Sequence, residues 1–425
     1  MTTTSFRTEH DLLGTLPVPK DAYYGIQTLR AWENFQLSGV SLSEYPNFVC
    51  ALAMVKLAAA DANHELGCLS ADRHSAITKA CRQIIQGEHH DQFVVDMIQG
   101  GAGTSTNMNA NEVIANLGLL SMGKQKGEYQ FLHPNNDVNM AQSTNDAYPT
   151  AIRVGLLLGQ NDLLDSLERL IQPFAEKGVE IASMLKMGRT QLQDAVPMTL
   201  GQEFKAFANN LREDLTLLKK LGSELFTPVN LGGTAIGTGI NADPRYQGIA
   251  VARLAAISGH PVTAAGDLVE ATYDMGSFVL FSGLLKRLMT KLSKICNDLR
   301  MLSSGPRTGI NEINLPPRQP GSSIMPGKVN PVIPEAVNQI AFEVIGNDLS
   351  VTMAAEAGQL QLNVMEPLIA WKMFDSVRLA RRGMDMLREL CVEGITANEQ
   401  RCRELVEHSI GLVTALTPYI GYENS

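Results

Sequence analysis

Long apolar runs are missing from this sequence of 425 residues. No stretch reaches the roughly 18 consecutive apolar residues that indicate a transmembrane helix, so neither a membrane span nor a membrane partner is expected. The N-terminal stretch MTTTSFRTEHDLLG contains no apolar segment of the secretory type. The six cysteines are scattered without C-x-x-C spacing, which is typical of reduced thiols. These absences predict a cytoplasmic protein.

Clusters of basic residues are missing too. The chain has 35 lysines and arginines against 44 aspartates and glutamates, a formal net charge of -9, and no long run of one sign. Because proteins that bind nucleic acid need clustered cations to neutralise phosphates, we expect no nucleic-acid partner. A small anion can still bind where a few donors and a cation converge.

The motifs of metal and dinucleotide sites are absent as well. None of the eight histidines belongs to an H-E-x-x-H motif or a similar pair, so no metal-ligating residues are predicted. The run GGTAIGTG, residues 232–239, has neither the preceding strand nor the G-x-G-x-x-G spacing of a dinucleotide site.

Helical periodicity is the strongest pattern that the sequence does contain. The segment FSGLLKRLMTKLSKICNDLRML, residues 281–302, repeats apolar residues at spacings of three, four and one, which forms one wide apolar stripe on a helix. Similar patterns cover roughly 149–185, 200–224, 245–258, 333–356 and 367–390. Because alternating strand patterns are scarce, we predict a mainly all-α fold, a bundle of long helices rather than a βαβ fold.

Five polar segments rich in Ser, Thr, Asn and Gly separate the helical patterns. They cover residues 99–112, 133–150, 187–197, 230–241 and 321–331. Such residues are also favoured in helix caps and turns, which explains any one segment taken alone. Five together favour a binding site for a carboxylate, because hydroxyls, amides and open backbone N–H groups hold an anion without burying many charges.

The segment GSSIMPGKVNP, residues 321–331, joins two adjacent serines to a Gly-Lys pair. It is not a phosphate-binding loop, because Pro326 takes the place of the second glycine and Val329 follows the lysine where Ser or Thr is needed. A serine nucleophile stays open, although no G-x-S-x-G motif is present. A dicarboxylate would supply the pairing that a buried Lys328 requires.

This segment resembles the long and specific signature of the aspartase/fumarase superfamily, whose members release fumarate by cleaving a C–N or C–O bond. The polar segments at 99–112, 133–150 and 187–203 match the family in the same order, so the resemblance covers nearly the whole chain. Residues 186–204 and 354–367 are most similar to the aspartase branch. Fumarases carry histidine after the threonine of GRT, where this chain has Gln191; some aspartases carry histidine there as well.

The resemblance implies a central bundle of very long helices that tetramerises into a twenty-helix core, with each active site assembled from three subunits. It implies an N-terminal domain over 1–145, the long-helix bundle domain over 146–396, and the start of a small C-terminal domain over 397–425. Family members have a longer C-terminal domain. We therefore expect a shortened chain or residues beyond those printed.

The resemblance also implies the reaction, which is conversion of L-aspartate to fumarate and ammonia through an enediolate. Ser322 matches the general base that removes the β-proton. The residues that match substrate-binding positions are Thr104, Ser143, Thr144 and Ser323 at the β-carboxylate, Lys328, Asn330 and Thr190 at the α-carboxylate, and Asn145, Thr190 and Gln191 around the departing amine. No cofactor is required, but Mg²⁺ activation stays open, as does a second dicarboxylate contact near His133 and Asn135.

Three functions remain at this point. The first is an aspartase, and the second is a class II fumarase or another lyase that releases fumarate. The third is a catalytically silent member of the family that is kept as a structural or regulatory oligomer. The presence of Ser322, Lys328, Asn330 and Thr190 argues against the third, because a silent protein needs none of them.

Overall fold

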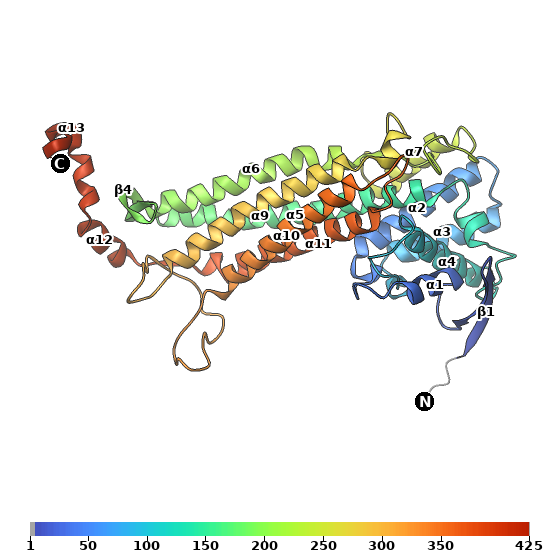
Figure 1. Cartoon of the computed structure of the whole chain (residues 1–425), viewed down its shortest axis with the longest axis horizontal. Helices are drawn as coiled ribbons and strands as arrows, with labels where there is room; N and C mark the ends of the chain where they lie inside the picture. Colours follow the sequence, from blue (N-terminus) through green and yellow to red (C-terminus); the bar gives the residue numbers. More distant parts are fainter. Residues whose placement is uncertain (1–4, 425) are drawn as a thin grey trace. The chain divides into compact units, whose positions relative to one another are not determined.

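Helices dominate residues 5–424, the part of the chain that this computed structural model describes (Figure 1). The predicted helices correspond to α5 (Thr144–Glu180), α6 (Leu200–Phe226), α7 (Tyr246–Ser258), α9 (Gly276–Leu302), α10 (Val332–Glu356) and α11 (Glu366–Leu390). The further helices are α1 (Ile26–Asn34), α2 (Pro46–Glu65), α3 (Ala71–Ile85), α4 (Thr104–Ser121), α8 (Glu270–Tyr273), α12 (Glu399–Glu407) and α13 (Thr417–Ile420). The mainly helical fold class is therefore confirmed.

Strands are short and form two-stranded sheets. The antiparallel pairs are β1 (Phe6–Asp11) with β2 (Gly14–Pro19), β3 (Leu185–Thr190) with β4 (Gln193–Thr199), and β7 (Ile313–Asn314) with β8 (Thr396–Ala397). A parallel pair joins β5 (Pro228–Val229) to β6 (Thr263–Ala264). None of the helices in residues 5–424 combines the length and the apolar character needed to cross a bilayer.

The chain divides into two units. The first consists of Met1–Asn161, Lys220–Ser282 and Asn347–Asp375, and the second of Asp162–Lys219, Gly283–Gly346 and Ser376–Ser425. The domain boundaries near residues 145 and 396 stay predictions.

Helix α2 forms the centre of the first unit, where it packs against α3, α4 and α7. Its sequence is rich in alanine and apolar around most of its circumference, and most of its side chains are buried. A helix that is apolar all round needs neighbours on every side, which these three helices supply.

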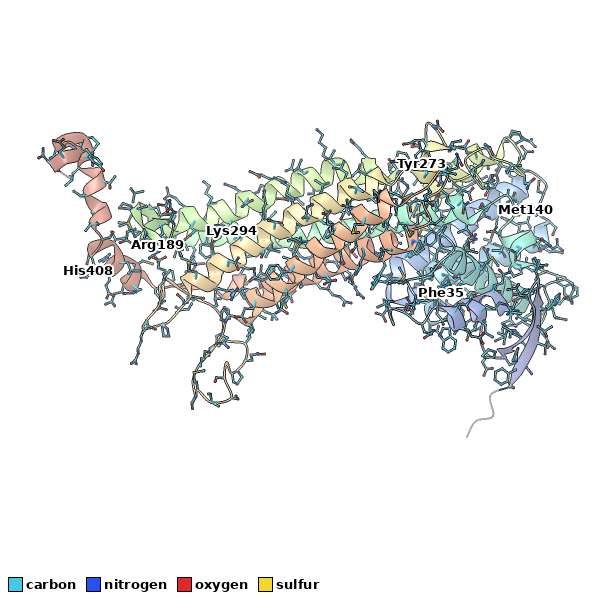
Figure 2. The ribbon with its side chains drawn as sticks, viewed as in Figure 1. Phe35, Met140, Arg189, Tyr273, Lys294 and His408 are labelled. Carbon is cyan, nitrogen blue, oxygen red and sulfur yellow. The ribbon has the colours of Figure 1, made fainter. Side chains whose placement is uncertain are left out.

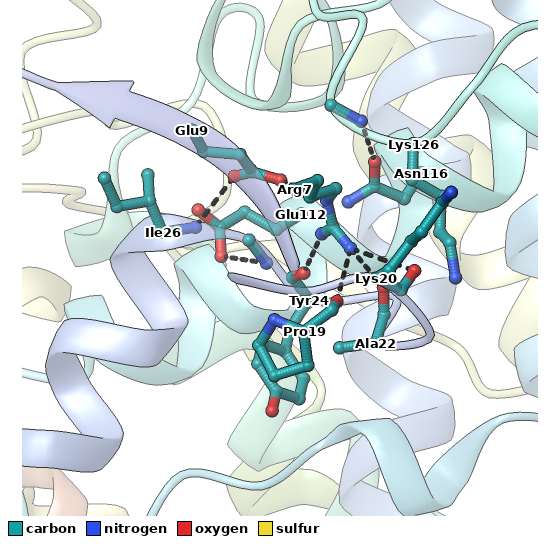
Figure 3. Close-up of polar contacts among 12 residues, drawn as sticks. Arg7, Glu9, Pro19, Lys20, Ala22, Tyr24, Ile26, Glu112, Asn116 and Lys126 are labelled. Atoms are coloured by element: carbon teal, nitrogen blue, oxygen red, sulfur yellow. Dashed lines mark hydrogen bonds and ion pairs between the residues drawn. The ribbon is translucent and has the colours of Figure 1, made fainter. Parts of the chain in front are cut away.

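A buried carboxylate of α4 caps the start of α1 in the first unit (Figure 3). The side-chain oxygens of Glu112 accept hydrogen bonds from the backbone N–H groups of Gly25, Gln27 and Thr28 at 2.8, 2.9 and 3.0 Å. These N–H groups have no partner within their own helix, so the carboxylate satisfies them. Burial nevertheless raises the pKa of Glu112 to about 7. From β1, Arg7 donates to the carbonyl oxygens of Pro19, Ala22 and Tyr24.

The apolar stripe predicted for residues 281–299 is confirmed on α9. Its fully buried members are Phe281, Leu285, Leu288, Leu292, Ile295, Cys296 and Leu299. Leu284 is half-buried because it lies at the margin of the stripe.

Two of the polar segments that were expected to separate the helices are themselves partly helical. In the segment 99–112, helix α4 begins at Thr104, and in the segment 133–150, helix α5 begins at Thr144. Helix α5 also ends at Glu180, although the pattern suggested 185. The expectation was wrong for α4 because its asparagines are buried side chains of a packed helix, and packing overrides their weak helix propensity.

Candidate active site

The loop at 321–331 is irregular, and its two ends are joined by hydrogen bonds. The N–H of Gly321 donates to the carbonyl oxygen of Lys328 at 2.7 Å, and Asn330 Nδ2 donates to the carbonyl oxygen of Gly321 at 2.7 Å. A side chain at position 321 would meet the Lys328 carbonyl oxygen at 2.7 Å, so only glycine allows this closure. Ser322 and Lys328 line the same cavity of about 440 Å³.

Ser322 Oγ is an acceptor in this loop. It receives the backbone N–H groups of Ile324 and Met325 at 3.2 and 3.0 Å. Donors directed at a hydroxyl oxygen favour its ionised form, since hydrogen bonds to the charged state lower the cost of losing the proton. Ser323 and Lys328 are exposed on the same loop, where a substrate can reach them.

Thr190 and Gln191 lie at the tip of the hairpin formed by β3 and β4. Thr190 pairs with Gln193 across a two-residue turn, and the turn residues Gln191 and Leu192 have φ of 52° and 61°. A tight hairpin turn of this kind requires the left-handed region at both positions, which side chains other than glycine adopt at a cost. Backbone strain of this type is concentrated at functional sites. Both predicted binding residues are exposed.

Ser143, Thr144 and Asn145 lie at the start of α5 in the first unit. Ser143 Oγ accepts the N–H of Asn145 at 3.3 Å, and Asn145 Nδ2 donates to the carbonyl oxygen of Ala235 at 2.8 Å. The N-terminus of a helix favours an anion, because its first N–H groups are unpaired and the helix dipole is positive there. The three half-buried side chains therefore suit a carboxylate.

Thr104 lies at the start of α4, also in the first unit, and it lines a cavity of about 410 Å³ together with Asn135. Next to it, Gly103 has φ of 90°, and a side chain there would meet the ring of Tyr148 at 2.5 Å. His133 borders another cavity, of about 420 Å³. Its Nδ1 accepts the N–H of Asn135 at 3.0 Å, and burial lowers the pKa of its ring.

A buried lysine that the sequence prediction missed connects α4 to the residues before α5. Lys56 Nζ donates to the side-chain oxygens of Asn107, Asn139 and Gln142 at 2.6, 2.9 and 2.9 Å. Asn107 Nδ2 in turn donates to Thr144 Oγ1 at 3.2 Å. A single lysine inside the apolar run ALAMVKLAAADAN was the available signal, since lysine is rarely buried without partners.

Asp146, in the first turn of α5, joins the start of this helix to the segment at 230–241. Its carboxylate accepts the N–H groups of Ser143, Gly232 and Thr234 at 2.9, 3.0 and 3.0 Å. Burial raises the pKa of Asp146 to about 6 and lowers the pKa of Lys56 to about 7, while their opposite charges counteract both shifts. The first unit thus holds Ser143 and Thr144 on a fixed polar network.

The predicted site residues are divided between the two units. Thr104, Ser143, Thr144 and Asn145 belong to the first unit, whereas Thr190, Gln191, Ser322, Ser323, Lys328 and Asn330 belong to the second. Across residues 5–424, no hydrogen bond joins the hairpin tip to the loop at 321–331. The same described residues include no group of three or more His, Cys, Asp or Glu side chains placed to hold a metal ion.

Comparison with known proteins decides the family. The family described as lyase matches residues 14–346. The chain belongs to this lyase family. The lyase is 77% identical over 421 residues to an aspartate ammonia-lyase of Pseudomonas fluorescens. The aligned region covers 99% of this chain and 88% of the relative. The resemblance to the aspartase/fumarase superfamily is thereby confirmed.

Solved structures agree with this assignment. A fumarate lyase:delta crystallin of Brucella melitensis superposes on this lyase with a TM-score of 0.96 at 60% identity, covering 99% of this chain and 91% of that chain. A class II fumarase of Schistosoma mansoni superposes with a TM-score of 0.94 at 35% identity, covering 99% and 91%. The same fold therefore occurs in relatives with more than one named activity.

Proposed function

We propose that this lyase converts L-aspartate reversibly into fumarate and ammonia. The observation that carries this proposal is the 77% identity to an aspartate ammonia-lyase over nearly the whole chain. The loop at 321–331 supports it, because it combines an acceptor serine with a cation at one cavity.

The reaction must stabilise charge that develops on the substrate. The alkoxide of Ser322 takes the β-proton of aspartate, and the electron pair of the broken C–H bond moves into the β-carboxylate to form an enediolate. When the enediolate collapses, the Cα–Cβ double bond forms, the C–N bond breaks, and the electron pair of that bond leaves with ammonia. Hydroxyls and helix N-termini that bind the enediolate more tightly than the carboxylate accelerate the first step.

The assignment of the remaining residues follows from charge and donor type. Thr104, Ser143, Thr144 and Ser323 offer hydroxyls to the β-carboxylate, where the second charge forms. Lys328 and Asn330, with Thr190, hold the α-carboxylate, and Asn145, Thr190 and Gln191 surround the amine. Exposed Lys328 can form a charge-assisted contact with a carboxylate of the substrate, which favours binding of a dicarboxylate.

Fumarate formation from L-malate is the second candidate, favoured by the fold shared with a class II fumarase at 35% identity. The absorbance of fumarate, followed after adding L-aspartate and then L-malate to separate samples, distinguishes the two. We expect fumarate and ammonia from aspartate and no comparable rate from malate. Fumarate from malate alone would refute the proposal. We further propose that no cofactor is required, and repeating the assay with and without Mg²⁺ tests activation by the metal.

Homotetramer formation is a further part of the proposal, supported by an exposed stripe on α10. Phe342, Ile345, Leu349 and Met353 are spaced by three or four residues, and Phe342 and Met353 are 63% and 65% exposed. Residues at this spacing share one face of a helix, and an uncovered apolar face of this kind marks a protein interface.

The six cysteines, all free, support a reducing compartment such as the cytoplasm.

Shared active sites predict complementation between inactive variants. If Ser322 and Thr190 of one site come from different chains, mixed tetramers of Ser322→Ala and Thr190→Ala subunits contain intact sites. Random mixing of equal amounts makes roughly a quarter of the sites intact. We expect fumarate production to reappear after subunit exchange, and light scattering to give the mass of a tetramer. A fully active monomer would rule out the shared site.

Gln191 gives a prediction about the leaving group. Its amide oxygen at the hairpin tip can accept from the substrate ammonium, a group that fumarate lacks. Gln191→Ala should therefore raise KM for aspartate by a larger factor than it raises the inhibition constant for fumarate. Equal effects on the two ligands would show that Gln191 only maintains the turn.

A further inference from the structure

A buried carboxylate of the second unit lies behind the hairpin that carries Thr190. The Glu312 side chain is 0% exposed, and each of its oxygens forms an ion pair with a residue of β3. Lys186 Nζ is 2.8 Å from Oε2, and Arg189 Nη2 is 2.9 Å from Oε1. Lys186 Nζ also pairs with Glu203 of α6 at 2.5 Å. Two carboxylates therefore balance two cations, as burial of charge requires.

The backbone of Glu312 is fixed as firmly as its side chain. Its N–H donates to the carbonyl oxygen of Leu302 at the end of α9 at 2.9 Å, and its carbonyl oxygen accepts the N–H of Asn398 at 2.9 Å. Backbone hydrogen bonds to α9 and to Asn398 therefore hold Glu312 in place. The chain then enters β7, and eight residues after β7 ends it reaches Ser322 (Asn314 to Ser322).

The hairpin needs such an anchor because a two-stranded hairpin by itself is marginally stable. Its register shifts between Met187 and Arg189, directly before the tip. Helix α12 also packs against β3. Arg189 is labelled in Figure 2. Among residues 5–424, Glu312 supplies the one carboxylate that forms an ion pair with Arg189. Arg189 is the residue directly before Thr190, so its fixation determines where the tip begins.

We propose that Glu312 is a positioning residue for substrate binding. Through its ion pairs with Lys186 and Arg189, it fixes the orientation of Thr190 and Gln191. Because Glu312 also precedes the loop of Ser322 in the sequence, it links the hairpin to the segment that leads into that loop. Glu312 does not touch substrate. The inference rests on the proposed function, because the roles of Thr190 and Gln191 are assigned there.

A matched control exists in the same unit. Asp214 of α6 is also a buried carboxylate between two cations, with Arg287 Nη1 at 2.6 Å and Lys291 Nζ at 2.8 Å. Its partners lie on α9 and are not adjacent to any predicted site residue. If the buried ion pairs of this unit contribute only to stability, removing the charge of either carboxylate should lower Tm and leave KM unchanged.

The experiment compares Glu312→Gln with Asp214→Asn, each purified as the full chain. Thermal unfolding, KM for aspartate, kcat and the inhibition constant for fumarate are measured for both. We expect a lower Tm in both variants. Only Glu312→Gln should raise KM, about tenfold or more, because a displaced Thr190 loses its hydrogen bond to the charged substrate, and such a bond is worth roughly tenfold to a hundredfold in affinity. Its kcat should change less than KM. Equal KM values in the two variants would overturn the inference.

A second pair of variants covers the case in which Glu312→Gln does not fold. Arg189→Gln removes the cation next to Thr190, and Arg287→Gln removes the matching cation of the control pair. KM should rise in Arg189→Gln only. An unchanged KM in Arg189→Gln would contradict the inference without any use of the first pair.

A double-mutant comparison separates positioning from a general loss of structure. If Glu312 acts through Thr190, the effect of Glu312→Gln on the dissociation constant of succinate, which needs no turnover, should be much smaller in a Thr190→Ala background, since residues acting on one contact are not additive. Additive effects would overturn the inference. Wild-type enzyme that makes no fumarate from aspartate would instead refute the proposed function, so the two failures are distinguishable.

Discussion

Replacing Ser322 by alanine should lower kcat for aspartate deamination by at least about two orders of magnitude. A positioned general base typically contributes about 10²–10⁴-fold, or roughly 3–5 kcal/mol of the barrier. The residues that hold the two carboxylates remain in the variant, so the affinity for a dicarboxylate inhibitor such as succinate should stay within a few-fold. Steady-state kinetics and inhibition measurements test both parts.

Ser323→Ala is the control for this prediction. Ser322 Oγ receives two backbone N–H groups, which favour its ionised form, whereas Ser323 is an exposed neighbour. Ser323→Ala should lose turnover through weaker stabilisation of the enediolate while keeping part of the proton removal. A Ser322→Ala enzyme with a kcat close to that of the wild type would show that another group is the base.

Lys328→Ala should weaken dicarboxylate binding by about 1.5–3 kcal/mol, because it removes a charge-assisted contact with the α-carboxylate. Since one tenfold step is about 1.4 kcal/mol, the expected loss is roughly tenfold to a hundredfold in affinity. The loss in kcat/KM should be larger if the ammonium group also supports the Ser322 alkoxide at the cavity that both residues line.

Lys328→Arg serves as the comparison. A planar guanidinium does not replace a compact ammonium group in a site shaped for it, so we expect poor rescue. The dissociation constant of succinate, measured by calorimetry for the wild type and both variants, is the direct readout. Unchanged affinity for succinate in Lys328→Ala would show that Lys328 does not bind the α-carboxylate.

The helical core of the fold could be predicted from the sequence because its signal is local. The stripe of α9 repeats every three or four residues, and all of its members except Leu284 are fully buried. The start of α4 could not be predicted in this way. Its asparagines have a low helix propensity, and they are helical because the packed first unit buries them.

The candidate site was predictable only in part, for a different reason. Motifs identified the hydroxyls and the lysine, but their supporting residues come from distant positions in the chain. Lys56 reaches Gln142, and Lys186 reaches Glu312, through pairings that no local pattern reveals. The left-handed turn at Gln191 was not predictable either, because no glycine marks it.

Removal of the β-proton by Ser322 is the central step of the proposed reaction, and exchange of that proton with solvent tests it directly. The enzyme is incubated with L-aspartate in deuterium oxide, and deuterium at the β-carbon of the remaining aspartate is followed by NMR. We expect exchange in the wild type, reduced exchange in Ser323→Ala, and none above background in Ser322→Ala. Exchange in Ser322→Ala at the wild-type rate would show that Ser322 is not the base.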